Sequence, residues 1–361
     1  MLILGIFIFH FCGMFPYKIV PGVGHLFVGV FFMLSGFGLM ESYKNKEGYL
    51  DNFIGNKTAR LLVPVWIAGI IVLVIQWFVF DNYSVISNHN YLFDLISGGP
   101  GTTSTWFVVE LIFFYIIFYF SFKYLKFKKA FLSVIIMVII LMAVLSYQQQ
   151  AMWYGSGLMF PVGLLLSHYK NKIENARLCT TVFVSSIAAI LLSCIVSIPL
   201  EPAINNLIFA NLQCFLTALM IICVLILRQN NVYLWLIVLI VLNTLYYLTG
   251  IVSGHNGNLI AIMPLLSVIL LLSGLNSLSW VTDFIGSISY EIYIIHGMMI
   301  LVSKEFFSDI WVCLFLSLIL SIFLAYIIKQ ISGTFFDKKK PLDLLCNASS
   351  ALGYDKGFRL R

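Results

Sequence analysis

GHLFVGVFFMLSGFGLMES, residues 24–42, opens a stretch that continues through a short polar connection and ends in LLVP at residues 61–64. An apolar helix, a basic loop and a second apolar helix in this order are typical of a hairpin that crosses a membrane twice. Ser35 and Gly36 lie inside the first helix, and Lys57 and Arg60 lie at the mouth of the second. A passive anchor needs neither pair, so this stretch favours a membrane protein that carries out chemistry.

The composition predicts the same environment for most of the chain. Hydrophobic residues make up 61% of the sequence and charged residues 10%, and the mean hydropathy is +1.00. Charged residues form about a quarter of a typical soluble domain, so a soluble globular protein is excluded. Apolar runs of roughly 16 to 22 residues suit spanning helices, because barrel strands need only about ten. We therefore predict an all-α, polytopic transmembrane bundle of about 10 to 12 spans.

Twelve apolar runs are candidate spans, and the first of them is short. Their predicted limits are residues 2–15, 24–40, 61–80, 105–122, 130–147, 152–167, 178–198, 207–227, 232–248, 259–273, 285–302 and 310–329. Together they form one transmembrane domain, residues 1–330, which is followed by a basic cytoplasmic tail, residues 331–361. The longest predicted outer loop, residues 81–104, contains no Lys or Arg.

The distribution of basic residues predicts the orientation of these spans. If the chain starts in the cytoplasm and changes side at each span, all of the 21 Lys and Arg residues except Lys18 and Lys304 are cytoplasmic. This asymmetry is the positive-inside pattern of multi-pass membrane proteins, and one missed internal span would scramble it. It places both termini in the cytoplasm and explains the net charge of +6 without a nucleic acid partner.

Several kinds of site are not indicated by the sequence. The seven cysteines are scattered, mostly in apolar segments, and no two form a Cys-x-x-Cys pair. We interpret them as small apolar residues, so we predict neither a disulfide framework nor a metal site. No glycine-rich phosphate loop, zinc pattern or nucleic-acid module stands out either.

Three ionisable side chains lie well inside predicted spans: His10, Glu110 and His296. Such residues are costly in lipid, which raises the expectation of a function. His10 lies roughly 14 Å along its helix from Met1, well inside the bilayer. Its imidazole can take a proton from a hydroxyl nucleophile near neutral pH. The alternative is a histidine that only hydrogen-bonds between packed helices.

Lys57 and Arg60 are three residues apart at the cytoplasmic end of the third predicted span. Side chains at this spacing lie on neighbouring turns of one helix face. Two cations on one face can bind the same diphosphate or nucleotide phosphate. The alternative explanation is positive-inside anchoring, or contact with lipid headgroups.

Trp106 and Glu110 are four residues apart and share a helix face near the outer end of the fourth predicted span. An acid beside an aromatic ring can bind a sugar hydroxyl while the ring stacks on the face of the sugar. Trp106 is also what the interfacial aromatic belt of a membrane protein contains. An acid one turn inside a span has no such routine explanation.

Ser289, Tyr293 and His296 fall on one stripe of the eleventh predicted span, at spacings of four and three. The stripe could line a polar cavity, or could join neighbouring helices by hydrogen bonds. We interpret Ser35, beside Gly36, first as a site of close helix packing. It has neither a nucleophile elbow nor a placed base beside it.

Six segments in one order carry a resemblance to a known family. They contain His10; GVFFMLSGF at residues 29–37; Lys57, Arg60 and Pro64; Trp106 and Phe107; Phe160, Pro161 and Gly163; and Ser289, Tyr290, Ile292, Tyr293 and His296. With them the chain resembles the membrane acyltransferase 3 family, which modifies carbohydrates with acetyl or related acyl groups. The family's basic pair is usually two arginines, and Lys57 keeps the charge of the first but loses its guanidinium fork.

The resemblance implies a carbohydrate O-acyltransferase of a bacterial inner or plasma membrane, with acetyl-CoA or another acyl-CoA as co-substrate and no bound cofactor. Lys57 and Arg60 would hold the phosphates of acyl-CoA, which arrives from the cytoplasm. His10 would act as general base or as transient acyl carrier, with Glu110 as the second catalytic candidate. The acceptor is a surface or secreted polysaccharide or its lipid-linked precursor. The acceptor or cavity-lining candidates are Ser35, Trp106, Tyr293 and His296.

Two other functions remain open from the sequence. A glycan exporter would also have many spans and buried polar groups, but it would need a continuous polar path, often between repeated halves. No internal repeat stands out, and few charges lie inside the spans. The other alternative is a scaffold without activity in a glycan assembly complex.

Overall fold

The computed structural model describes residues 2–15, 24–82, 106–148, 151–173, 208, 211, 212, 214, 215 and 279–336. Within these parts of the chain the regular structure is helical throughout, as the all-α prediction requires. The predicted spans at 178–198, 232–248 and 259–273 and most of that at 207–227 lie outside the described residues. So do the outer loop from residue 83 and the tail from residue 337.

The helices follow the predicted spans in order and place. They are α1 (Leu2–Met14), α2 (Gly24–Asn45), α3 (Phe53–Phe78), α6 (Trp106–Tyr124), α7 (Phe127–Gln148), α8 (Met159–Ile173), α14 (Ser279–Ser287), α15 (Ser289–Phe306) and α16 (Ile310–Phe336), with a short 3-10 helix at Ala151–Trp153. Five of them, α2, α3, α6, α7 and α16, are long and apolar enough to cross a membrane. The pair α14 and α15 makes a sixth if it counts as one span.

Several helices are longer than the apolar runs that predicted them, and the excess is largest for α3 and α16. α3 begins at Phe53, and α16 continues to Phe336. The apolar run marks only the part of a helix inside the hydrocarbon, whereas the backbone hydrogen-bond ladder continues into the polar interface. Lys57 and Arg60 therefore lie within a regular helix. Residues 331–336, which we expected in the polar tail, are the last part of α16.

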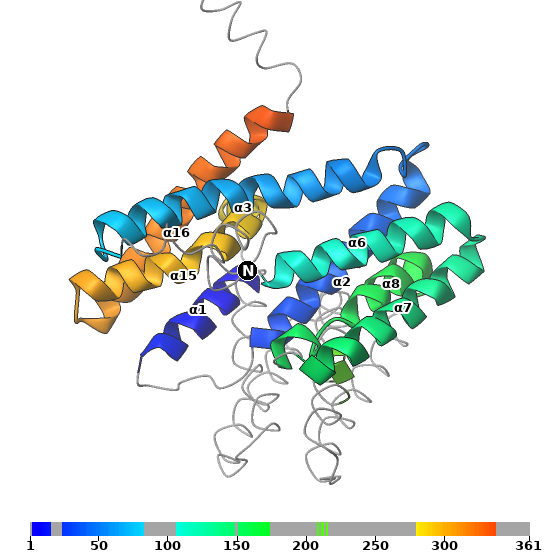
Figure 1. Ribbon diagram of the computed structural model, residues 1–361, viewed down its shortest axis with the longest axis horizontal. Helices are drawn as coiled ribbons and strands as arrows, with labels where there is room; N and C mark the ends of the chain where they lie inside the picture. The colour runs from blue at the N-terminus through cyan, green and yellow to red at the C-terminus, as the bar shows by residue number, and fades with distance from the viewer. Residues whose placement is uncertain are drawn as a thin grey trace, which may run out of the picture.

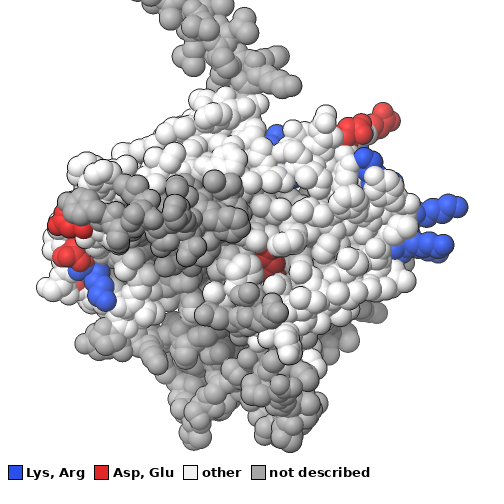
Figure 2. Space-filling view, viewed as in Figure 1, with Lys and Arg blue, Asp and Glu red and all other residues white. Residues whose placement is uncertain are grey.

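The surface of the described helices suits a lipid environment. Large apolar side chains are exposed along α3, α7 and α16, for example Ile70, Ile140 and Phe315. Figure 2 shows that most Lys, Arg, Asp and Glu side chains of the visible face gather at its left and right edges, with a largely uncharged surface between them. Membrane proteins typically have a largely uncharged surface where they contact lipid tails and charged residues at the two membrane–water interfaces.

Contacts between helix ends agree with the predicted orientation. Lys304, predicted to lie outside, donates a hydrogen bond to the Met14 carbonyl at the outer end of α1 (2.9 Å). At the other end of the bundle, Lys44 donates to the Ser167 carbonyl of α8 (2.8 Å). Both lysines thus contact helix segments that the alternating topology puts on their own side of the membrane.

The helices form two groups that one helix connects. α1, α15 and α16 lie together, and α2, α6, α7 and α8 form the second group, as Figure 1 shows. α3 runs along both groups and contacts α6 on one side and α15 and α16 on the other. α1 contacts α2 as well as α15, so the two groups also meet directly.

The closest packing in the second group is between α2 and α8. A Cβ atom on Gly36 would collide with the carbonyl oxygen of Phe160, and one on Gly163 would collide with that of Met33. The two backbones can approach this closely only because both positions lack a side chain. This confirms Gly36 as a packing site, and it gives the Phe-Pro-x-Gly helix a structural role.

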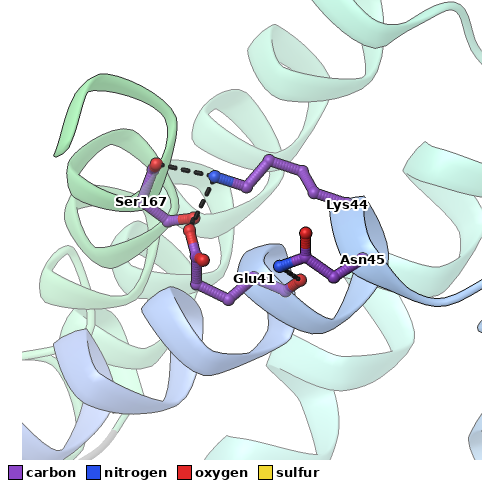
Figure 3. A network of polar contacts seen from close by, with 4 residues as sticks. All are labelled: Glu41, Lys44, Asn45 and Ser167. Carbon is purple, nitrogen blue, oxygen red and sulfur yellow. Dashed lines mark hydrogen bonds and ion pairs between the residues drawn. The ribbon is translucent and has the colours of Figure 1, made fainter. Parts of the chain in front are cut away.

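A polar network fixes the cytoplasmic ends of the same two helices (Figure 3). The Glu41 carboxylate accepts a hydrogen bond from the Ser167 hydroxyl (2.7 Å) and pairs with Lys44 (2.6 Å). Lys44 also reaches the Ser167 carbonyl, so one acid and one base of α2 are both satisfied on α8. Asn45 closes the end of α2 through the Glu41 carbonyl (2.9 Å).

The span predicted at residues 285–302 is interrupted near its start, and its helix is continuous only from Ser289. The chain bends by 74° between α14 and α15. Ser287 and Ser289 flank the bend, and their hydroxyls donate to the carbonyls of Phe284 and Gly286 (both 2.8 Å). Serine hydroxyls that occupy nearby backbone carbonyls in this way compete with the regular helix ladder. A hydropathy average does not detect this competition, because most residues around the two serines are apolar.

Candidate active site

Two histidines from opposite ends of the sequence meet between the helices. His10 lies on α1 and His296 on α15, and their ring centres are 5.0 Å apart with an angle of 55° between the rings. Because α1 contacts both α15 and α2, the pair lies close to where the two helix groups meet (Figure 1). Ionisable residues that pair inside a membrane domain are typical of functional sites.

The backbone of α15 fixes the orientation of the His296 ring. Its Nδ1 lies 2.7 Å from the Tyr293 carbonyl oxygen and 3.2 Å from that of Ile292. Carbonyl oxygens only accept hydrogen bonds, so Nδ1 carries the hydrogen whenever the ring is neutral. Nε2 then offers a lone pair, and this buried atom has no hydrogen-bond partner within the described parts of the chain.

His10 is the more accessible of the two rings. Its side chain is half-buried, whereas that of His296 is fully buried. Phe9 packs edge-on against the His10 ring, with centres 5.2 Å apart. His10 is thus the ring of the pair that keeps some contact with the surroundings of the protein.

Tyr293 connects the histidines to α6. Its ring centre lies 5.9 Å from that of His296 and 5.1 Å from that of Phe107. Its hydroxyl is also within electrostatic range of the Glu110 carboxyl. Tyr293 and His296 thus share a buried face of α15, as the predicted stripe requires. Ser289, the third residue of the predicted stripe, lies at the bend instead, and its hydroxyl donates a hydrogen bond to the Gly286 carbonyl.

Glu110 has the least ordinary environment of the acidic residues that the structure describes. It is 1% exposed, and neither carboxyl oxygen has a hydrogen-bond partner in the described segments. A Cβ atom on Gly157 would lie 2.8 Å from its Oε1, so the missing side chain at Gly157 makes room for the carboxyl group. Burying a polar group without a partner is costly to a fold, and such groups concentrate at functional sites.

One helical turn before Glu110 on α6, Trp106 takes part in an aromatic pair. Trp106 is buried, and its ring centre lies 6.0 Å from that of Trp153 and 6.5 Å from that of Phe107. Trp153 belongs to the short 3-10 helix before α8. Nothing in the sequence singles out Trp153, because its partner lies on another helix. Trp106, four residues before Glu110 on α6, thus packs against an aromatic ring from outside its own helix.

The basic pair lies on the first turns of α3, as predicted. Lys57 Nζ is 5.6 Å from the centre of the Tyr49 ring, and the Arg60 guanidinium carbon is 6.0 Å from that of Phe336. Burial raises the pKa of Tyr49, so the ring beside Lys57 is an uncharged phenol. No carboxylate pairs with either cation among the described residues. Both charges therefore remain available for an anionic ligand.

One hydrogen bond connects the helix of the basic pair to the helix of His296. The Tyr290 hydroxyl, on the first turn of α15, donates to the Leu61 carbonyl of α3 (2.7 Å). Pro64 has no N–H, and the carbonyl that this N–H would bond in the helix ladder is that of Arg60, one residue before Leu61. The sequence alone could not pair Tyr290 with Leu61, because the two residues lie 229 positions apart.

Ser35 has a different position from the other predicted cavity residues. Its hydroxyl and that of Tyr115 are 2.9 Å apart, so it joins α2 to α6. This contact matches the interpretation as a packing site.

In the parts of the chain that the structure describes, no three His, Cys, Asp or Glu side chains are grouped so that they could hold a metal ion.

Comparison with known proteins places this site in a family. A family model described as an acyltransferase domain matches residues 1–233, which include His10, Lys57, Arg60 and Glu110 but end before His296. Searches of curated proteins and of solved structures gave no match. The matched segment covers more than half of the 361 residues. The chain therefore belongs to the membrane acyltransferase 3 family, and it is an acyltransferase with a multi-pass helical membrane domain.

Proposed function

We propose that this protein transfers an acyl group, most simply acetyl, from acyl-CoA to a hydroxyl of a surface or secreted polysaccharide or of its lipid-linked precursor. The observation that carries the proposal is the half-buried His10 ring, in contact with a second, buried histidine inside the membrane domain of an acyltransferase. An intramembrane histidine within reach of a substrate suits general base catalysis. The membrane would be the bacterial inner or plasma membrane.

The donor would bind at the cytoplasmic end of α3. Acyl-CoA is a cytoplasmic metabolite with several phosphate groups, and Lys57 and Arg60 offer two unpaired cations on one helix face. The guanidinium of Arg60 can bind a phosphate through two parallel hydrogen bonds, whereas the ammonium of Lys57 acts as a point charge. The thioester would then extend from this end of α3 towards His10.

The reaction needs one proton acceptor and one leaving group. His10 takes the proton of the acceptor hydroxyl while the hydroxyl oxygen attacks the thioester carbonyl carbon. The carbon–sulfur bond breaks, the ester forms, and the proton on His10 passes to the departing thiolate, which leaves as CoA. The same residue would alternatively carry the acyl group for a moment, with attack by an imidazole nitrogen preceding attack by the hydroxyl.

The acceptor would lie beside α6. Trp106 and Trp153 offer ring faces for a sugar, and Glu110 offers an unpartnered carboxyl group for one of its hydroxyls. Tyr293 lies between this region and the histidines, so a sugar held here would have a hydroxyl directed towards His10. Binding and chemistry would thus be divided between the two helix groups.

The proposal predicts that His10→Ala removes the ester from the glycan and leaves the glycan itself. Surface glycan is purified from cells with the wild-type protein, without the protein and with His10→Ala, and its mass is measured before and after mild alkali. We expect an alkali-labile acyl mass with the wild-type protein alone, and the mass difference identifies the acyl group. The expected loss is at least about a hundredfold, the usual contribution of a general base.

His168→Ala is the matched control for this experiment. His168 is exposed near the cytoplasmic end of α8, where it contacts Phe127 and Tyr169. We expect this variant to retain the ester. An unchanged ester content without the protein, together with less glycan outside the cells, would contradict acyl transfer and favour export or assembly of the glycan instead.

A further inference from the structure

His296 carries an unused hydrogen-bond acceptor in the centre of the site. Its Nε2 is buried and has no partner among the described residues, and its Nδ1 is held by two carbonyl oxygens of its own helix. A buried polar atom without a partner is rare and calls for an explanation. Among the described residues, the polar ring on another helix that contacts His296 is that of His10, with ring centres 5.0 Å apart.

The distance between the two rings suits a direct hydrogen bond. A nitrogen lies roughly 1.2 Å from the centre of an imidazole ring, and hydrogen-bonded atoms are about 3 Å apart, so two imidazoles joined by a linear N–H to N bond have centres about 5.4 Å apart, and a bent bond brings them closer. The observed separation of His10 and His296 is 5.0 Å. Rotation of the half-buried His10 ring is enough to form the bond, because His296 is already fixed by its carbonyl partners.

We propose that His296 is a positioning residue for His10. Its Nε2 accepts the N–H of one His10 nitrogen and so keeps the other His10 nitrogen unprotonated and directed at the acceptor hydroxyl. The arrangement resembles in logic the orienting carboxylate of a catalytic triad, with the backbone carbonyl of Tyr293 behind it as the anchor. The inference rests on the proposed function, in which His10 removes the hydroxyl proton.

The proton count of the reaction is unchanged by this arrangement. His10 gains the hydroxyl proton on its free nitrogen and returns it to the thiolate, while its other N–H stays in the bond to His296. The bond becomes stronger when His10 is an imidazolium, because its donor is then charged. His296 therefore favours the charged intermediate over the ground state, which affects kcat more than the KM for acyl-CoA.

The test compares two variants that differ in one property. His296→Leu has a similar volume and no acceptor, whereas His296→Gln places a carboxamide oxygen close to the position of Nε2. Membrane vesicles from the producing cells receive radiolabelled acetyl-CoA, and label in the glycan is measured against acetyl-CoA concentration and normalised to the amount of protein. His168→Leu is the control, because that histidine lies near the cytoplasmic end of α8.

We expect His296→Leu to lower kcat at least about a hundredfold with the KM for acetyl-CoA within about threefold, and His296→Gln to restore kcat to within about tenfold of the wild type. His10→Ala/His296→Leu should be no slower than His10→Ala, because residues that act as a unit are not additive. If His296→Leu does not accumulate, His296→Met replaces it as the variant of similar length without the acceptor nitrogen.

Three results would overturn the inference. They are an unchanged kcat in His296→Leu, an equal loss in the Leu and Gln variants, and additive losses in the double variant. Each of them leaves the proposed function intact as long as His10→Ala abolishes labelling. Equal labelling by the wild type and His10→Ala would instead contradict the proposed function itself, so the two failures are distinguishable.

Discussion

At the scale of single residues, Lys57 and Arg60 have separate environments although they share a helix face. Lys57 is half-buried, and its ammonium group lies over the Tyr49 ring. Arg60 is exposed, and its guanidinium lies over the ring of Phe336, at the end of α16. Each cation is thus oriented by an aromatic ring and not by an acid. This keeps both charges in place without neutralising them, which a phosphate site requires.

Arg60→Ala should weaken the binding of acyl-CoA more than it slows the reaction. Loss of a charge-assisted contact to phosphate at a partly exposed site is worth about 1.4 kcal/mol, or about a tenfold higher KM for acetyl-CoA, with kcat within about threefold. Initial rates in membrane vesicles over a range of acetyl-CoA concentrations measure both constants. Lys46→Ala, an exposed cation before α3, is the control, and an unaltered KM in Arg60→Ala would remove Arg60 from the donor site.

At the scale of the elements, α2 and α8 hold one helix group together through their backbones. Gly36 faces the carbonyl of Phe160, and Gly163 faces the carbonyl of Met33, so neither helix can move away or rotate without opening the contact. The Glu41, Lys44 and Ser167 network closes the same pair at its cytoplasmic end. α2 thereby becomes a fixed surface against which α1, the helix of His10, packs.

Gly36→Ala should destabilise the protein, and Gly38→Ala should not. A methyl group on Gly36 collides with backbone of α8, for which overpacking costs about 1 to 3 kcal/mol, whereas nothing lies within 4 Å of a Cβ on Gly38. Both changes improve helix propensity equally, so the comparison isolates the contact. Thermal unfolding of the detergent-solubilised variants measures the difference. Equal midpoints would contradict the close α2–α8 approach.

At the scale of the whole molecule, the charge distribution predicts one orientation, and the contacts between helix ends agree with the predicted alternation of sides. Basic residues gather at the cytoplasmic ends of α2, α3 and α6, and Lys304 joins the outer ends of α15 and α1. Under the proposed function, the donor would bind at the cytoplasmic end of α3 and the acceptor beside α6, nearer the outer side. A membrane domain of this kind can bring a cytoplasmic donor and an external acceptor together without releasing either to the wrong side.

This orientation predicts the accessibility of two positions. Glu47→Cys, between α2 and α3, should react with a membrane-impermeant maleimide only after the cells are opened, whereas Ser308→Cys, between α15 and α16, should react in intact cells. The wild-type protein with its native cysteines gives the background. Labelling of both positions from the same side would contradict the alternating topology, because an odd number of the spans between them would then have been misassigned.

The sequence by itself determined the helices, their orientation and the residue types of the site. Hydropathy and spacing are local properties, so they predicted α1 to α3 and named His10, Glu110 and the basic pair before any contact was known. The same local patterns did not predict the bend before Tyr290. There, two serine hydroxyls inside an apolar run donate hydrogen bonds to backbone carbonyls.

Only the tertiary structure decided which of these residues meet. In lipid, apolar helix faces are nearly interchangeable, so the partner of each helix is chosen by small residues and polar contacts that lie far apart in the sequence. Three contacts of this kind are seen here: the close approach of α2 and α8 at their glycines, the hydrogen bond from Tyr290 to α3, and the contact of α1 with α15. They bring His10 to His296, and no pattern within either helix could have shown that these two rings lie 5.0 Å apart.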